Sequence, residues 1–106
     1  MAFINLHEIE EKEPFPGFTA RFVHSENMTF GYWDIEAGGL FPEHSHAHEQ
    51  IAAVIEGEVE LTINGETQVL GPGSVAVIPS KAVHSGRTIT RCRVIDVFHP
   101  VREDYR

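Results

Sequence analysis

Short apolar runs separated by turn residues dominate the chain. Residues 58–63 alternate polar and apolar side chains, a pattern typical of a half-buried strand. Asn64-Gly65 follows at once and favours a two-residue hairpin, because both residue types tolerate the positive φ of a type I′ turn. Residues 66–70 are therefore predicted to return antiparallel to residues 58–63.

The same pattern predicts further strands along the sequence. Phe30, Tyr32 and Trp33 give one of them the bulky side chains that strands favour. No segment predicts a long helix, although residues 5–12 are compatible with a helical turn or two. Many short antiparallel strands without crossover helices predict an all-β fold, and a closed double-sheet barrel protects strand edges best. The expected strands are residues 18–23, 28–36, 50–55, 58–63, 66–70, 74–78 and 91–98.

Length and composition predict one globular domain, residues 1–106, with a core that needs no disulfides. Cys92 is the single cysteine, so no internal disulfide is possible. A formal net charge of −8 argues against a nucleic-acid partner, since phosphate binding needs basic patches. The N-terminus lacks a signal-peptide pattern and no apolar run is long enough for a membrane span, so we expect a cytoplasmic protein with no membrane partner.

The candidate chemistry is concentrated in residues 44–50, His-Ser-His-Ala-His-Glu-Gln, together with His84. On a strand, residues i and i+2 point to the same face, so His44 and His46 are expected to reach one ion, with Gln50 further along and His84 from another strand. Three imidazoles, an amide oxygen and no thiolate suit one divalent transition metal with exchangeable positions, a feature of catalytic sites. The alternative is a histidine-rich surface loop. The orientation of His48 stays open, and His7, His24 and His99 are interpreted as surface or structural residues.

Two motifs carry a family resemblance. Gly38-x5-His44-x-His46-x3-Gln50-x6-Gly57 resembles the first motif of the cupin superfamily, over residues 38–57. Gly73-x5-Pro79-x4-His84 resembles the second, over residues 73–88. The resemblance implies a double-stranded β-helix, the cupin or jelly-roll barrel. Gln50 departs from the usual Glu, which removes a charge from the metal site and leaves the ion more electrophilic. Lys81 and Thr88 depart from a common Gly and Asn.

Asp96 stands out because Asp is depleted from strands. It shares a face with Val94 and Phe98. If that face points into the barrel, the carboxylate is buried and needs a partner, because an isolated buried charge is costly. Two interpretations stay open on the residues alone. Asp96 forms an ion pair with an arginine, or it transfers protons beside the metal with a shifted pKa. The candidate ion-pair partners are Arg21, Arg87, Arg91 and Arg102.

The segment from Asp96 to Tyr105 resembles the C-terminal tail of a cupin subgroup from pectin and alginate breakdown, and residues 44–50 resemble its first motif. Those enzymes convert ring-closed 4,5-unsaturated monouronates to linear keto-uronates. The resemblance implies metal ligands at His44, His46, Gln50 and His84 for Zn, Ni, Fe, Mn, Co or Cu. It implies proton transfer by Asp96, sugar packing by Phe98 and carboxylate binding by Arg102, with a small anionic sugar acid as substrate. His99, Lys81 and the short spacing from His84 to Asp96 depart from the subgroup.

Two other functions remain possible at this point. One is a metal-dependent dioxygenase or lyase acting on a small acid, and oxygen consumption would distinguish the dioxygenase. The other is a non-catalytic cupin that binds a sugar or another small ligand. A homodimer is expected, formed through sheet edges, with residues 18–23 pairing across a two-fold axis.

Overall fold

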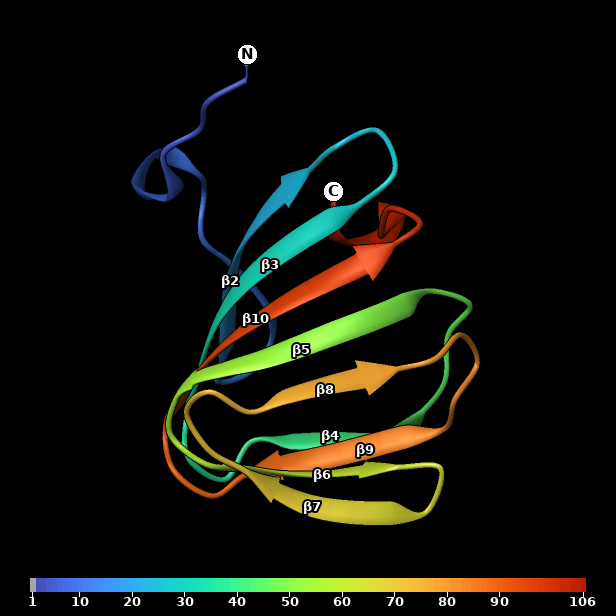
Figure 1. The fold of residues 1–106 in the computed structure, drawn as a ribbon. Coiled ribbons are helices and arrows are strands. Elements are labelled where there is room, and N and C mark those ends of the chain that lie inside the picture. The colour runs from blue at the N-terminus through green and yellow to red at the C-terminus, as the bar shows by residue number, and fades with distance from the viewer. Residues whose placement is uncertain (1) are drawn as a thin grey trace.

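The computed structural model describes residues 2–106 and arranges their strands in two antiparallel sheets that face each other (Figure 1). One sheet has the order β1-β2-β3-β10-β5-β8 and the other the order β4-β9-β6-β7. The all-β double-sheet barrel predicted from the sequence is therefore confirmed. The strands are β1 (Lys12–Phe15), β2 (Phe18–His24), β3 (Thr29–Ile35), β4 (Leu40–His44), β5 (Glu49–Glu56), β6 (Val59–Ile63), β7 (Glu66–Leu70), β8 (Val75–Ile78), β9 (His84–Thr88) and β10 (Cys92–His99).

The predicted hairpin is present with the predicted turn. Ile63 pairs with Glu66 across the β6–β7 ladder. Asn64 and Gly65 between them have φ values of 48° and 83°. Positive φ at both positions is what a type I′ turn requires, so the local sequence sets the register of this ladder.

Three strands, β1, β4 and β9, are absent from the ranges expected from the hydrophobic pattern. β1 and β4 lie at sheet edges and contain Pro14 and Pro42, which an edge strand tolerates because its outer backbone groups need no ladder partner. β9 is polar, yet it pairs with β4 on one side and β6 on the other. Its Gly86 lies so close to β6 that a Cβ there would be 2.9 Å from the Glu60 carbonyl oxygen.

The N-terminal expectations need correction. β2 lies between β1 and β3, so residues 18–23 are not a free edge for pairing with a second copy. The helical turn η1 covers only Leu6–Glu8 within the expected range 5–12. Figure 1 shows this segment leading away from the sheets beyond β2. No helix among residues 2–106 has the length and hydropathy of a membrane span.

The core fills the space between the sheets. β3 alternates buried and half-buried residues along its whole length, as expected for a strand with one face inward. Phe22 meets Trp33 edge to face with ring centroids 5.5 Å apart, and Phe18 meets Phe41 of the opposite sheet at 4.8 Å. The Phe22–Trp33 contact lies within the larger sheet, whereas the Phe18–Phe41 contact joins the two sheets. Each such contact adds about 0.5–1.5 kcal/mol beyond area burial.

The outer face of the larger sheet carries an apolar row beside charged residues such as Arg93 and Asp34. Val97 of β10 lies beside Phe30 of β3 and Ile51 of β5, and Ile51 lies beside Val77 of β8. Ile51 and Val77 are 45% and 60% exposed. A row of apolar side chains therefore crosses four strands on the outside of the barrel.

Candidate metal centre

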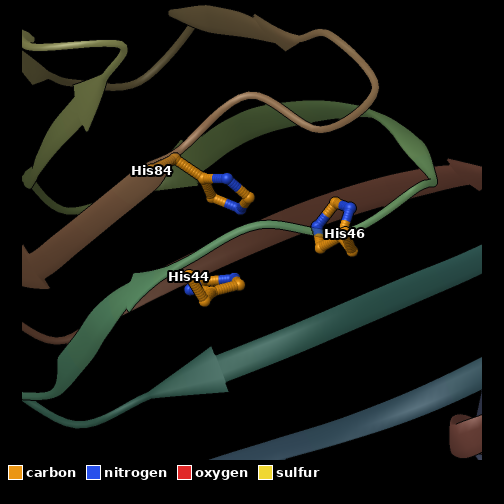
Figure 2. Close-up of side chains that lie close together, drawn as sticks. All are labelled: His44, His46 and His84. Carbon is orange, nitrogen blue, oxygen red and sulfur yellow. The ribbon is translucent and has the colours of Figure 1, made fainter.

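His44, His46 and His84 converge at one end of the barrel (Figure 2). One ring nitrogen from each lies within 4.8 Å of the others. His44 ends β4 and pairs directly with His84, the first residue of β9. The rings of His44 and His84 are 4.1 Å apart between centroids, and those of His46 and His84 are 4.9 Å apart. The predicted grouping of the three histidines is present.

The local reason for this grouping differs from the expected one. β4 ends at His44, and His46 lies in the connection to β5 rather than on a strand. Strand alternation therefore does not align the two rings. The Nδ1 of His46 hydrogen-bonds to the backbone carbonyl of His48 at 2.9 Å, which orients the ring.

Backbone carbonyls set the tautomer of all three histidines. The Nδ1 atoms of His44, His46 and His84 lie 2.7, 2.9 and 2.9 Å from the carbonyl oxygens of Pro42, His48 and Ala82. A carbonyl only accepts, so each Nδ1 donates and each Nε2 keeps its lone pair. Metal-binding histidines are commonly oriented by such a bond from the other ring nitrogen.

Burial keeps two of these imidazoles neutral. His84 is buried and His46 half-buried. Loss of water lowers the pKa of each below its usual value, although the bonds to the Ala82 and His48 carbonyls favour the charged form. Metal ligation needs neutral imidazole, so this environment lowers the proton competition for the site.

Gln50 completes the set of oxygen and nitrogen donors. It is 8% exposed on β5, and its Oε1 lies 3.2 Å from Nε2 of His46. Its Nε2 donates to Oδ1 of Asp96 at 3.0 Å, which turns the amide oxygen toward the histidines. Three imidazole nitrogens and one amide oxygen that face the same space form a ligand set that suits a divalent transition metal. The three histidines can hold a metal ion, and ligation by Gln50 stays a prediction.

The comparisons with known proteins agree with this arrangement. A family profile described as cupin domain matches residues 31–98, a span that includes His44, His46, Gln50 and His84. The chain belongs to the cupin domain family.

Three relatives match 94% or more of this cupin. The solved structure of KdgF from Halomonas sp. is 28% identical, with a TM-score of 0.93 over 100% of this chain and 99% of that chain. An RmlC-like cupin from Shewanella frigidimarina is 24% identical, with a TM-score of 0.94 over 100% and 96%, and shows the fold alone. Uncharacterized protein SCO3923 of Streptomyces coelicolor is 29% identical over 102 residues, which are 94% of this chain and 97% of its relative.

Asp96 lies inside the cupin barrel, on the face of β10 that it shares with Val94 and Phe98. Burial raises the pKa of Asp96 to about 6, against the opposing effects of the Gln50 hydrogen bond and the Arg102 charge. Its hydrogen-bond partner is an amide and not an arginine, so the ion-pair interpretation is wrong. Each candidate arginine pairs with another carboxylate: Arg21 with Glu11, Arg87 with Glu60, Arg91 with Asp34 and Arg102 with Asp104.

A small cavity opens beneath the histidines of the cupin site. Its volume is about 60 Å³, and its polar lining includes His44, Gln50, His84 and Asp96. Most of the remaining lining is aliphatic, with Val54 and Ile78 among its residues. Pockets that enclose drug-sized ligands are about 300–1,000 Å³. The cavity therefore holds only a few water molecules or part of a larger ligand.

The C-terminal tail covers one side of the site, and Figure 1 shows it beside the end of β10. Phe98 is 2% exposed, and its ring centroid lies 6.0 Å from that of His46. The Arg102 guanidinium lies 4.7 Å from the Phe98 ring centroid. Phe98 was expected to pack against a sugar, but here its ring supports His46 and Arg102 and offers no free face.

The orientation of His48, left open by the sequence, is toward the tail. Its Nε2 lies 3.3 Å from the carbonyl oxygen of Val101, and its Nδ1 is buried with no hydrogen-bond partner among the described residues. His48 therefore lies next to the histidine cluster without belonging to it. Cys92, at 1% exposure, is part of the apolar core.

Proposed function

We propose that this cupin is a metal-dependent enzyme that opens ring-closed 4,5-unsaturated monouronates and yields linear keto-uronates. The observation that carries the proposal is a carboxyl group, Asp96, linked through the Gln50 amide to three convergent imidazoles. The resemblance of residues 44–50 and 96–105 to cupins of pectin and alginate breakdown adds the substrate class.

The proposed reaction is a net isomerisation. Ring opening breaks the bond between C1 and the ring oxygen and releases the C1 hydroxyl proton, which leaves an aldehyde. Ketonisation then forms a C–H bond at C4 and a carbonyl at C5. One proton is lost and one is gained, so a single acid–base group suffices and no oxidant is needed.

Asp96 has the properties that this proton transfer requires. In the metal-free protein burial raises the pKa of Asp96 to about 6, so this carboxyl group takes up a proton more readily than an exposed Asp does. The hydrogen bond from Gln50 leaves the second carboxylate oxygen, Oδ2, for the substrate. His44, His46 and His84 would hold a divalent metal, which would supply Lewis acidity toward a substrate oxygen.

Arg102 supplies the positive charge for a uronate carboxylate. Its charge lowers the pKa of His46, His84 and Asp96, so it lies within electrostatic reach of the site. Burial has the larger effect on each group: it lowers the pKa of the two histidines and raises that of Asp96. The cavity of about 60 Å³ is too small for a whole sugar. We therefore place the reacting end of the sugar at the histidines and its remainder at the mouth, where His44 is exposed.

The direct test follows the ultraviolet absorbance of a 4,5-unsaturated monogalacturonate. Metal-loaded protein is expected to accelerate the loss of the conjugated chromophore, and a chelator is expected to abolish the acceleration. Asp96→Asn is expected to lower turnover at least about a hundredfold, because general acid–base catalysis contributes about 10²–10⁴-fold. Arg102→Ala is expected to lower turnover because it removes the charged partner of the uronate carboxylate. Full turnover by both variants would contradict the proposed roles, and no acceleration by metal-loaded protein would exclude this substrate.

A metal-dependent dioxygenase is the second candidate. The aliphatic cavity beneath the histidines has room for a diatomic molecule and excludes most sugars. Oxygen uptake with the iron-loaded protein and a panel of small acids distinguishes this candidate, since the isomerisation consumes no oxygen.

We also propose that the protein forms a homodimer through the apolar row on the outer face of the larger sheet. Single exposed apolar residues are ordinary, but a contiguous row marks a contact surface. Strands that are apolar on both faces are typical of sheets that are covered on both sides. Face-to-face packing of two copies would cover Ile51 and Val77 without any free strand edge.

A further inference from the structure

Among residues 2–106, the Arg102 guanidinium makes its hydrogen bonds through one of its two hydrogen-bonding edges. Nε donates to Oδ1 of Asp104 at 2.9 Å, and Nη2 donates to Oδ2 at 2.7 Å. An arginine has five N–H donors. The pair with Asp104 takes two of them on the Nε side, which leaves the Nη1–Nη2 edge for a second carboxylate.

We propose that Asp104 is a positioning residue that presents this free edge of Arg102 to the carboxylate of the substrate. The inference rests on the proposed function, in which Arg102 binds a uronate. Asp104 does not touch the substrate in this proposal. It holds the guanidinium in one rotamer, so that less side-chain freedom is lost when the substrate binds.

The exposure of the two side chains supports the view that Asp104 positions Arg102 and does not compete with the substrate carboxylate for it. The Arg102 side chain is 13% exposed and that of Asp104 is 58% exposed. Asp104 also lines an outer hollow of about 420 Å³ with Phe22 and Tyr105, whereas Arg102 is not part of that lining. The carboxylate thus lies on the solvent side of the guanidinium, and a substrate at the metal centre would approach from the other side.

The segment that carries Asp104 is itself anchored. Asp104 belongs to the helical turn η2 (Glu103–Tyr105), whose Tyr105 stacks on Phe22 with ring centroids 4.5 Å apart and planes 11° apart. The backbone N–H of Arg102 donates to Oγ1 of the fully buried Thr29 at 2.8 Å. The backbone segments that carry Asp104 and Arg102 are therefore both anchored to the core.

Two aromatic rings restrict the guanidinium further. Its central carbon lies 4.7 Å from the Phe98 centroid and 4.4 Å from the Tyr105 centroid. The two centroids are only 6.0 Å apart, so the rings form a corner and not a sandwich. The rings lie on two sides of the guanidinium and Asp104 lies on its Nε edge. The Nη1–Nη2 edge is the polar side that has no hydrogen-bond partner in the described part of the chain.

The test compares Asp104→Asn with Glu103→Gln. Both variants remove one negative charge from η2, but Glu103 pairs with Arg106 and not with Arg102. The probe is saturated D-galacturonate, with D-galactose as the sugar that lacks the carboxylate. Calorimetry on the protein as purified, with its metal content verified, gives the affinities. The Arg102 Nε–H resonance reports whether the guanidinium is held.

We expect Asp104→Asn to weaken galacturonate binding about three- to tenfold, the loss expected when one long side chain is no longer pre-ordered. Galactose binding is expected to stay unchanged, and the Arg102 Nε–H resonance to broaden. Glu103→Gln is expected to match the unsubstituted protein, and Asp104→Glu to recover part of the affinity. Unchanged or tighter galacturonate binding by Asp104→Asn would overturn the positioning role alone. If the unsubstituted protein does not prefer galacturonate over galactose, carboxylate recognition by Arg102 fails as well, and the proposed function with it.

Discussion

The side-chain amide of Gln50 connects Asp96 to the histidine cluster, with Nε2 3.0 Å from Asp96 Oδ1 and Oε1 3.2 Å from His46 Nε2. One amide thus gives a donor to the carboxylate and an acceptor atom to the metal centre. A carboxylate at position 50 would offer no donor to Asp96. The departure of this chain from the usual Glu of the family motif therefore has a physical consequence within the barrel.

Replacing Gln50 by Glu is expected to place two carboxyl groups within hydrogen-bond distance. Both cannot ionise at low cost, so one retains a proton and the pair titrates at higher pH. We expect the metal-free Gln50→Glu protein to lose about 1–3 kcal/mol of unfolding free energy at pH 8 and to recover most of it near pH 4. Urea denaturation at both pH values measures this. Gln68→Glu, the same change at an exposed residue of β7, is the control and should show no such pH-dependent loss.

Asp96 gives the metal-free protein a characteristic pH dependence. Its pKa is raised from an unfolded value near 3.8 to about 6. The folded state therefore binds more protons between these values, and stability from this group is present below pH 4 and is lost as the pH rises to 6. Asp96→Asn removes this titration. It is expected to stabilise the metal-free protein by about 1–3 kcal/mol at pH 7.5 and to have little effect at pH 4, since each pKa unit corresponds to about 1.4 kcal/mol.

Denaturation of the chelator-treated protein at several pH values checks this expectation. A stabilisation by Asp96→Asn that is equally large at pH 4 would mean that packing, and not titration, is responsible. Comparison with the turnover of the same variant then tests whether a group that costs stability is retained for activity.

The sequence predicted those parts of the fold that depend on neighbouring residues. The β6–β7 hairpin follows from Asn64-Gly65 and the alternation on either side of it. The range of β9 was not predicted because its residues, His-Ser-Gly-Arg-Thr, lack the apolar alternation of a strand. His84 faces the site, and Gly86 permits close approach to β6. A strand of this kind is held by its two neighbours and not by its own propensity.

The same distinction applies to the candidate site, where some contacts follow from local spacing and others depend on which strands pair. The spacing of His44, His46 and His84 within known motifs was sufficient to predict that they meet. The hydrogen bond between Asp96 and Gln50 was not predictable, because the two residues are 46 positions apart in the sequence. They meet only because β10 pairs with β5 in the folded sheet. The pairing of Arg102 with Asp104 was missed because the chain offers several carboxylates to each arginine.

The proposed dimer predicts an effect of Val77→Lys on association. Val77 is 60% exposed on β8, in the apolar row of the outer face. A lysine there would place two like charges in the interface of a symmetric dimer. We expect light scattering to give the mass of one chain for Val77→Lys and of two chains for Gln68→Lys on the opposite sheet. A dimeric Val77→Lys protein, or a monomeric unsubstituted protein, would exclude this face as the interface.

Gly57, the last residue of the first cupin motif, is expected to tolerate no side chain. Its φ is +86°, and a Cβ there would collide with the Arg91 carbonyl oxygen and lie 2.8 Å from the Cys92 sulfur. Gly65 has a similar φ of +83° but open space around it. We expect Gly65→Ala to cost about 1–2 kcal/mol, the penalty of the left-handed conformation alone, and Gly57→Ala to cost more or to prevent folding. Equal losses for the two variants in urea denaturation would refute the steric explanation.

Removal of His84 is expected to abolish metal binding without unfolding the barrel. His84 is buried, and its Nε2 is one of the three nitrogens left free by the backbone bonds to Nδ1. We expect elemental analysis to find about one divalent metal ion per chain in the unsubstituted protein and less than about a tenth of that in His84→Ala. Loss of a ligand removes far more affinity than the 10–100-fold effect of a residue that only orients one. His7→Ala, a change at an exposed histidine outside the cluster, should retain the metal. Circular dichroism of the two variants separates loss of metal from loss of fold, and full metal occupancy in a folded His84→Ala protein would place the ion elsewhere.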